Sequence, residues 1–94
     1  MRPAPGNIPK EEAQKIAIQA LAYLAGRPEE LGRFLALAGL GPANLRRAAA
    51  DPAFLTGIIE FLLQDEALLL AFTAELGIPP ATIGAAGRAL GGQP

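Results

Sequence analysis

The fold of this chain is decided by one stretch, Asp51 to Gly77, which reads DPAFLTGIIEFLLQDEALLLAFTAELG. Its large apolar residues recur at helical spacing, in two groups separated by Gln64-Asp65-Glu66. Burying each large side chain stabilises a fold by roughly 1.5–3 kcal/mol before conformational entropy is subtracted. The sequence therefore predicts a helical centre that the other segments cover.

This stretch is compatible with one helix or with two. Asp51-Pro52 is a strong helix start, because the carboxylate can accept from free backbone N–H groups and proline fits the first turn. Asp65 can cap a second helix in the same way, and Gly77 would end it. Nothing in residues 64–66 forbids one continuous helix over 51–76. We favour a break at Asp65.

Proline and glycine mark the bounds of the other predicted helices. These run from about Pro9 to Ala25, from Pro28 to Ala38, from Pro42 to Ala50, and from Pro79-Pro80 to about Leu90. The predicted buried faces include Ala38 and Leu63. Residues 1–8 are predicted to be a disordered lead-in and 91–94 a flexible tail. The predicted fold is all-α, a single helical domain over 9–90 that forms a compact bundle of five to six short helices.

An internal repeat is suggested when the chain is shifted by 38 residues, which lays 13–50 on 51–88. Phe34 then falls on Phe72, Gly39 on Gly77 and the pair Pro42-Ala43 on Pro80-Ala81. Eight identities are only modestly more than a chain so rich in Ala and Leu gives by chance, so biased composition remains the alternative explanation. If the repeat is real, the bundle consists of two pseudo-repeated three-helix units.

Composition excludes several classes of function. The chain has no Cys and no His, which removes thiolate nucleophiles, sulfur-ligated metals and the commonest general base. Five acidic residues fall in predicted first turns, where the helix dipole accounts for them: Glu11, Glu12, Glu29, Glu30 and Glu66. We therefore expect no enzyme activity, no catalytic residue, no metal site and no cofactor.

Charge and hydropathy bear on location and partners. The net charge is −1 and the pI is near 5.3, so no strong field draws the chain to nucleic acid or to anionic lipid. The start of the chain lacks an apolar run of signal-peptide length, and charged residues interrupt the richest apolar window. We expect a soluble cytoplasmic protein with no membrane contact.

The corner from Gly39 to Arg47 has the spacing of a helix-turn-helix, in which a glycine turn sets a second helix across the first. Arg46 and Arg47 would then face phosphate or guanine. The candidate recognition helix is short and the chain is acidic. We therefore favour a packing corner with two solvated arginines, and nucleic-acid binding is the second choice.

Ile18 and Leu70 project away from the main apolar stripes of their predicted helices. Their counterparts in the 38-residue alignment, Thr56 and Gly32, are not large apolar residues. The two side chains are either peripheral core contacts or exposed apolar spots for self-association or a partner protein.

Several segments together resemble a family of short, uncharacterised all-helical bacterial proteins classed as a domain of unknown function. The resemblance covers about residues 10–91. The motifs that carry it are Ala20-Leu21-Ala22-Tyr23-Leu24, Arg33-Phe34-Leu35-Ala36-Leu37-Ala38-Gly39-Leu40, Asp51-Pro52-Ala53-Phe54-Leu55 and Phe61-Leu62-Leu63-Gln64-Asp65-Glu66. It implies a compact helical bacterial protein and no activity, ligand or site residue. The segment 39–63 is also loosely similar to ubiquitin-associated-type three-helix bundles in its helix lengths and Gly-Leu corner, a likeness from which we infer no ubiquitin binding.

The function expected from the sequence is therefore binding. We expect a small helical protein-interaction or adaptor module with an unknown protein partner, or one that self-associates through Ile18 and Leu70. The alternative is a weak or auxiliary nucleic-acid-binding protein that uses Arg46 and Arg47.

Overall fold

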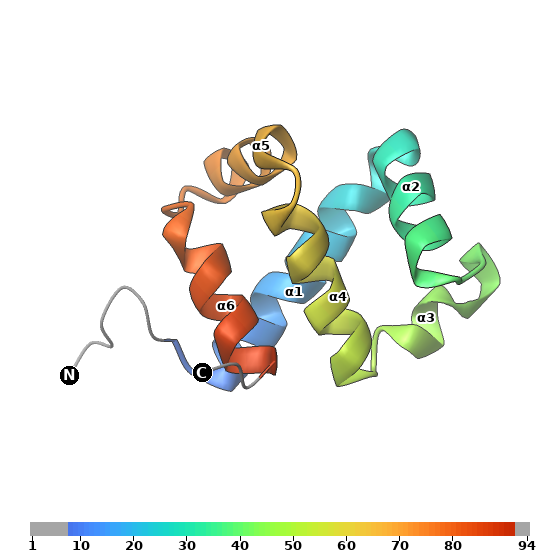
Figure 1. Cartoon of the computed structure of the whole chain (residues 1–94), viewed down its shortest axis with the longest axis horizontal. Coiled ribbons are helices and arrows are strands. Elements are labelled where there is room, and N and C mark those ends of the chain that lie inside the picture. Colours follow the sequence, from blue (N-terminus) through green and yellow to red (C-terminus); the bar gives the residue numbers. More distant parts are fainter. Residues whose placement is uncertain (1–7, 92–94) are drawn as a thin grey trace.

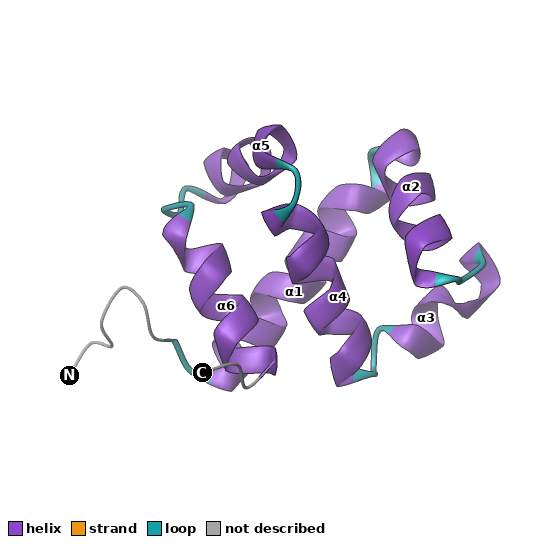
Figure 2. Ribbon diagram, viewed as in Figure 1, coloured by secondary structure: helices purple, strands orange, loops and turns teal. Residues whose placement is uncertain are grey.

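Six α-helices and one 3-10 turn make up the described part of the chain (Figure 1). The computed structural model describes residues 8–91, apart from the side chains of Pro42, Leu45 and Arg46. In chain order the elements are α1 (Lys10–Ala25), α2 (Pro28–Ala38), η1 (Pro42–Asn44), α3 (Leu45–Ala48), α4 (Pro52–Leu63), α5 (Glu66–Leu76) and α6 (Ala81–Gly91). Figure 2 shows only helices and loops over these residues. The prediction of an all-α bundle is confirmed.

The break between α4 and α5 occurs at Asp65, as the sequence predicts. The Asp65 carboxylate accepts a hydrogen bond from the Leu68 backbone N–H at 3.1 Å, which caps α5. Asp51 caps α4 by accepting from the Ala53 N–H at 2.9 Å. Asp65 favours a new helix start at the break because its carboxylate satisfies a backbone donor that the start of α5 would otherwise leave unpaired, and Asp51 does the same at the start of α4.

The core lies where α1 and α4 cross, with α6 packed against both (Figure 1). On α1 the buried residues include Ala13, Ala17 and Ala20, which are small enough to let a neighbouring helix lie close. α4 contributes the larger side chains, all less than a tenth exposed: Phe54, Leu55, Ile58, Ile59, Phe61 and Leu62. The stretch from which the fold was predicted thus supplies most of the large buried side chains, and α1 and α6 add small residues together with Ile16, Leu24 and Ile83.

The two halves of the bundle correspond in several local features. α5 begins and ends 38 residues after α2, and each helix is 11 residues long. Gly39 ends α2 with φ 71° and Gly77 ends α5 with φ 69°, a left-handed conformation that favours glycine. The Phe34 ring lies 5.3 Å from the Phe61 ring, and the Phe72 ring lies 5.4 Å from the Tyr23 ring. In the 38-residue alignment these two ring pairs are counterparts of each other.

Some of the predicted helix bounds are wrong, and so are some of the residues predicted to be buried. The helix expected over 42–50 is a 3-10 turn followed by the four residues of α3, and α6 begins at Ala81 rather than at the two prolines. Ala38 and Leu63 are exposed, because each lies beyond the edge of the face that its helix packs on the core. Ile8, placed in the lead-in, packs against the core, and Gly91, placed in the tail, is the last residue of α6. The remaining residues of those segments, 1–7 and 92–94, lie outside the described part of the chain.

No single helix within residues 8–91 is long and apolar enough to cross a membrane. α5 and α6 together pass a test of length and composition, but the chain bends by 99° between them.

Candidate protein-binding groove

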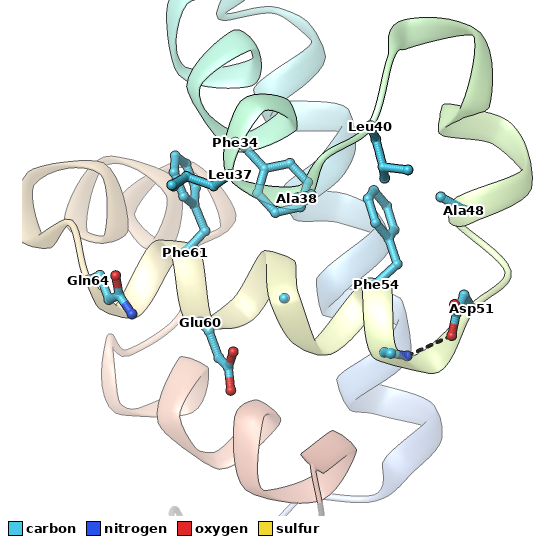
Figure 3. Close-up of a pocket in the computed structure, with 12 residues that line it drawn as sticks. Phe34, Leu37, Ala38, Leu40, Ala48, Asp51, Phe54, Glu60, Phe61 and Gln64 are labelled. Carbon is cyan, nitrogen blue, oxygen red and sulfur yellow. Dashed lines mark hydrogen bonds between the residues drawn. The ribbon is translucent and has the colours of Figure 1, made fainter.

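An open groove lies between α2 and α4 and is closed at one end by α3 (Figure 3). Its volume is about 550 Å³. Most of the side chains that line it are apolar. The lining residues are Phe34, Leu37, Ala38, Leu40, Ala48, Asp51, Ala53, Phe54, Gly57, Glu60, Phe61 and Gln64, which together define the α2–α4 groove.

Three phenylalanine rings form the floor of the α2–α4 groove. Phe34 of α2 lies between the other two rings, 5.4 Å from Phe54 and 5.3 Å from Phe61. The contacts are tilted and edge-on, the arrangement that aromatic pairs prefer. Because all three rings are also core residues, the floor is held in place by the packing of the bundle. A bound side chain would therefore meet a rigid apolar surface.

The walls of the groove are uneven. Leu37 stands at the α2 edge and is 74% exposed, the largest exposed fraction among the exposed large apolar residues of the described chain. On α4, by contrast, Ala53 and Gly57 lie one helical turn apart and leave the groove wide. A Cβ placed on Gly57 would meet no heavy atom within 4 Å. Small residues at this spacing allow another backbone to come close to α4.

Among the described residues that line the groove, the charged groups are acidic. Glu60 is exposed on α4, with its side chain pointing away from the three phenylalanine rings, and Asp51 is exposed at the end near α3, where its carboxylate caps α4 (Figure 3). Both carboxylates belong to the α4 side of the groove and leave the apolar floor uncovered. The α2–α4 groove therefore combines an apolar base with negative charge on its α4 side.

A second hollow of about 320 Å³ continues from Leu37 and Phe61 towards the α4–α5 junction. Here the Arg33 guanidinium donates to the Asp65 carboxylate at 2.7 Å and lies 5.2 Å from the centre of the Phe61 ring. The Leu68 backbone N–H, together with this hydrogen bond from Arg33, lowers the pKa of Asp65. Arg33, which lines this second hollow, is thus already engaged by a carboxylate and an aromatic face.

The structure does not bring the residues predicted from the sequence into this groove. Ile18 on α1 is 44% exposed and Leu70 on α5 is 45% exposed, so both are accessible, but neither lines the groove. Arg47 is exposed on α3, and the side chain of Arg46 lies outside the described residues. The partner-binding and nucleic-acid-binding roles of these residues stay predictions.

Sequence reasoning missed Leu37, Gly57 and Glu60. The signal that led to Ile18 and Leu70 also applies to Leu37, because its counterpart 38 residues later is the charged residue Glu75. No comparable signal marks Gly57, which reads as one more residue on the polar arc of α4. The groove depends on how α2 packs on α4, and local spacing does not reveal such a contact.

No acidic cluster in the described part of the chain is suited to hold a metal ion. The three threonines, Thr56, Thr73 and Thr82, lack a neighbouring imidazole because the chain has no histidine. Two of their hydroxyls donate to helix carbonyls, Thr56 to Pro52 and Thr73 to Leu69. These hydroxyls therefore have a local structural role within their helices.

A comparison with family models matches residues 10–93 to a family described as "Protein of unknown function (DUF3572)". Searches of curated proteins and of solved structures found no match.

Proposed function

Because this chain belongs to that family of proteins of unknown function, its own geometry must suggest a role, and we propose that it is a protein-interaction module that binds a partner in the α2–α4 groove. The observation that carries the proposal is the aromatic floor of the groove beside the exposed Leu37. Binding, rather than catalysis, is the chemistry that these groups support.

When the groove is empty, its exposed apolar surface is in contact with water, which costs free energy. Burying a leucine side chain fully is worth roughly 1.5–3 kcal/mol, so leaving about three quarters of Leu37 in water forgoes about 1–2 kcal/mol. Exposed leucines are common singly, but this one adjoins Ala38, Leu40 and the phenylalanine floor in a hollow. A partner that covers the groove would recover this energy.

The length of the groove suits a helical partner. Its α4 wall extends from Asp51 to Gln64 and includes the 12 residues of α4, which span roughly 18 Å at 1.5 Å per residue. A helix of about three turns has the same length. Docking of an amphipathic helix along such a groove is a recurrent mode of peptide recognition.

Nucleic-acid binding through Arg46 and Arg47 has less support as a second proposal. α3 is a single turn of four residues, whereas a recognition helix must reach along the major groove. Its test is a salt-dependent shift of duplex DNA that disappears when both arginines are changed to alanine. Absence of binding at low salt would count heavily against it.

The internal repeat also stays a proposal. The equal lengths of α2 and α5, their matching glycine ends and the counterpart ring pairs support it. A cytoplasmic location stays a prediction from composition.

Peptide display tests the groove directly. The immobilised chain is used to select binders from a random-sequence peptide library, and each binder is then measured against two variants. Gly57→Leu fills the groove, and Gly32→Leu is the matched control, because Gly32 is on α2, does not line the groove and also has nothing within 4 Å of an added Cβ.

We expect the selected peptides to bind the wild type and Gly32→Leu alike and to lose binding to Gly57→Leu. If no peptide is selected, or if the selected peptides bind both variants equally, the groove is not a binding site for proteins.

A further inference from the structure

We propose that the partner segment is an amphipathic α-helix of about three turns whose apolar face is flanked by lysine or arginine. The inference rests on the proposed function of the α2–α4 groove and adds the charge and conformation of what it binds. Both the shape of the groove and its charge lead to this partner.

The shape of the groove favours a helix over an extended segment. Ala53 and Gly57 face the groove from successive turns of α4, so a second helix can approach the α4 backbone closely. The Phe54 and Phe61 rings lie seven residues apart on the same helix, a spacing of two turns. Apolar anchors at positions i, i+4 and i+7 of a partner helix would follow this floor.

The charge of the groove favours a basic partner. Glu60 and Asp51, the charged residues among the described residues of the lining, are carboxylates on the α4 side. Glu66 is exposed and lines the adjoining hollow, which extends the acidic edge past the end of α4. Arg33 is paired with Asp65 at 2.7 Å, so its positive charge offsets little of the negative charge along this edge. Complementary charge on a partner would steer its encounter and fix its orientation.

A second copy of this chain fits the groove less well. Most homodimers are two-fold symmetric, so the same patch faces itself across the interface. Pairing of two α2–α4 grooves in that way would place the Glu60 and Asp51 carboxylates of both copies in one interface, and the described lining of the groove offers no cation to pair with them. The like charges would oppose the association, whereas lysine or arginine on a different chain would favour it.

Two labelled peptides test the inference on the full chain. The first is an amidated alanine-based helix of about fifteen residues, with leucine recurring at positions i, i+4 and i+7 and lysine on both flanks. The second has glutamate in place of every lysine. Fluorescence anisotropy gives the Kd of each peptide at low and at high salt, and sedimentation velocity reports whether the chain itself dimerises.

Two charge variants serve as a matched pair. Glu60→Lys reverses the charge at the groove, and Glu75→Lys makes the same change of net charge at an exposed position of α5 that does not line the groove. We expect Glu60→Lys to weaken binding of the lysine peptide roughly 3- to 20-fold at low salt, through one lost attraction and one new repulsion. Glu75→Lys should change it less, and Glu60→Lys should improve binding of the glutamate peptide.

The outcomes separate this inference from the proposed function. A basic helix is supported if the lysine peptide binds more strongly than the glutamate peptide and loses binding to Gly57→Leu. Glu60→Lys must also weaken binding of the lysine peptide more than Glu75→Lys does. Equal binding of the two peptides, still blocked by Gly57→Leu, overturns the basic partner and leaves the groove as a binding site. Binding of neither peptide, or a wild-type dimer that Gly57→Leu dissociates, also overturns the basic partner.

Discussion

Gly57→Leu places a large side chain in the open space of the α2–α4 groove, and the local structure of α4 determines its effect on stability. Gly57 lies inside α4, and an added Cβ would meet no heavy atom within 4 Å. Glycine in a helix interior is less favourable than a good helix former by roughly 0.5–1 kcal/mol. The substitution should therefore stabilise the fold while it fills the groove.

The same substitution at two other glycines provides a comparison for this change in stability. Gly32 of α2 also has free space around an added Cβ, so Gly32→Leu should give a similar gain. Gly87 of α6 does not, because its Cβ would lie 3.3 Å from Ile59 Cγ2 and 3.7 Å from Leu63 Cδ1. Ile59 is fully buried, so Gly87→Leu overfills the contact between α6 and α4. We expect it to cost about 1–3 kcal/mol.

The assay is thermal and urea unfolding followed by circular dichroism. For a domain of this size, a gain of 0.5–1 kcal/mol raises the Tm by roughly 2–8 °C. We expect this rise for Gly57→Leu and Gly32→Leu, and a fall for Gly87→Leu. If Gly57→Leu destabilised the chain while Gly32→Leu stabilised it, α2 and α4 would be closed on each other in solution and the groove would not exist.

Two further predictions concern the core and the α5 cap. Leu24→Ala should lower the free energy of unfolding in urea by about 2–5 kcal/mol, because Leu24 is fully buried. Leu37→Ala should change it by less than about 0.5 kcal/mol, because Leu37 is mostly exposed. Equal losses for the two variants would contradict the exposure of Leu37. The pKa of Asp65 is lowered by the Leu68 N–H and Arg33, so its contribution is present above the unfolded-state pKa, near 4, and is lost as pH falls through the folded-state value. The Tm advantage of wild type over Asp65→Asn should therefore shrink below about pH 4, and an advantage that grew there would refute the assignment.

The helix bounds could be predicted because local chemistry sets them. Asp51 and Asp65 accept from backbone donors at the starts of α4 and α5, and the left-handed Gly39 and Gly77 end α2 and α5. Each signal lies within a few residues of the bound that it marks. The 3-10 turn before α3 was not predicted, since the glycines and proline of that corner are compatible with either kind of helical turn.

The groove could not be predicted from such local signals, but the 38-residue alignment distinguishes the exposed apolar positions from the core. Four large apolar residues of the described chain are exposed, and the counterpart of each is small or polar. The pairs are Ile18 with Thr56, Leu37 with Glu75, Leu63 with Ala25, and Leu70 with Gly32. Each of these positions has a large apolar residue in one half of the chain and a small or polar residue in the other. The core therefore does not require an apolar residue there.

The most direct test of the α2–α4 groove is a nuclear magnetic resonance titration of the isotope-labelled chain with a bound peptide. We expect the largest backbone shifts at Leu37 and Gly57, and intermolecular contacts from the peptide leucines to the rings of Phe34 and Phe61. Shifts centred on Ile18 and Leu70, or on Arg47, would contradict the groove as the binding site.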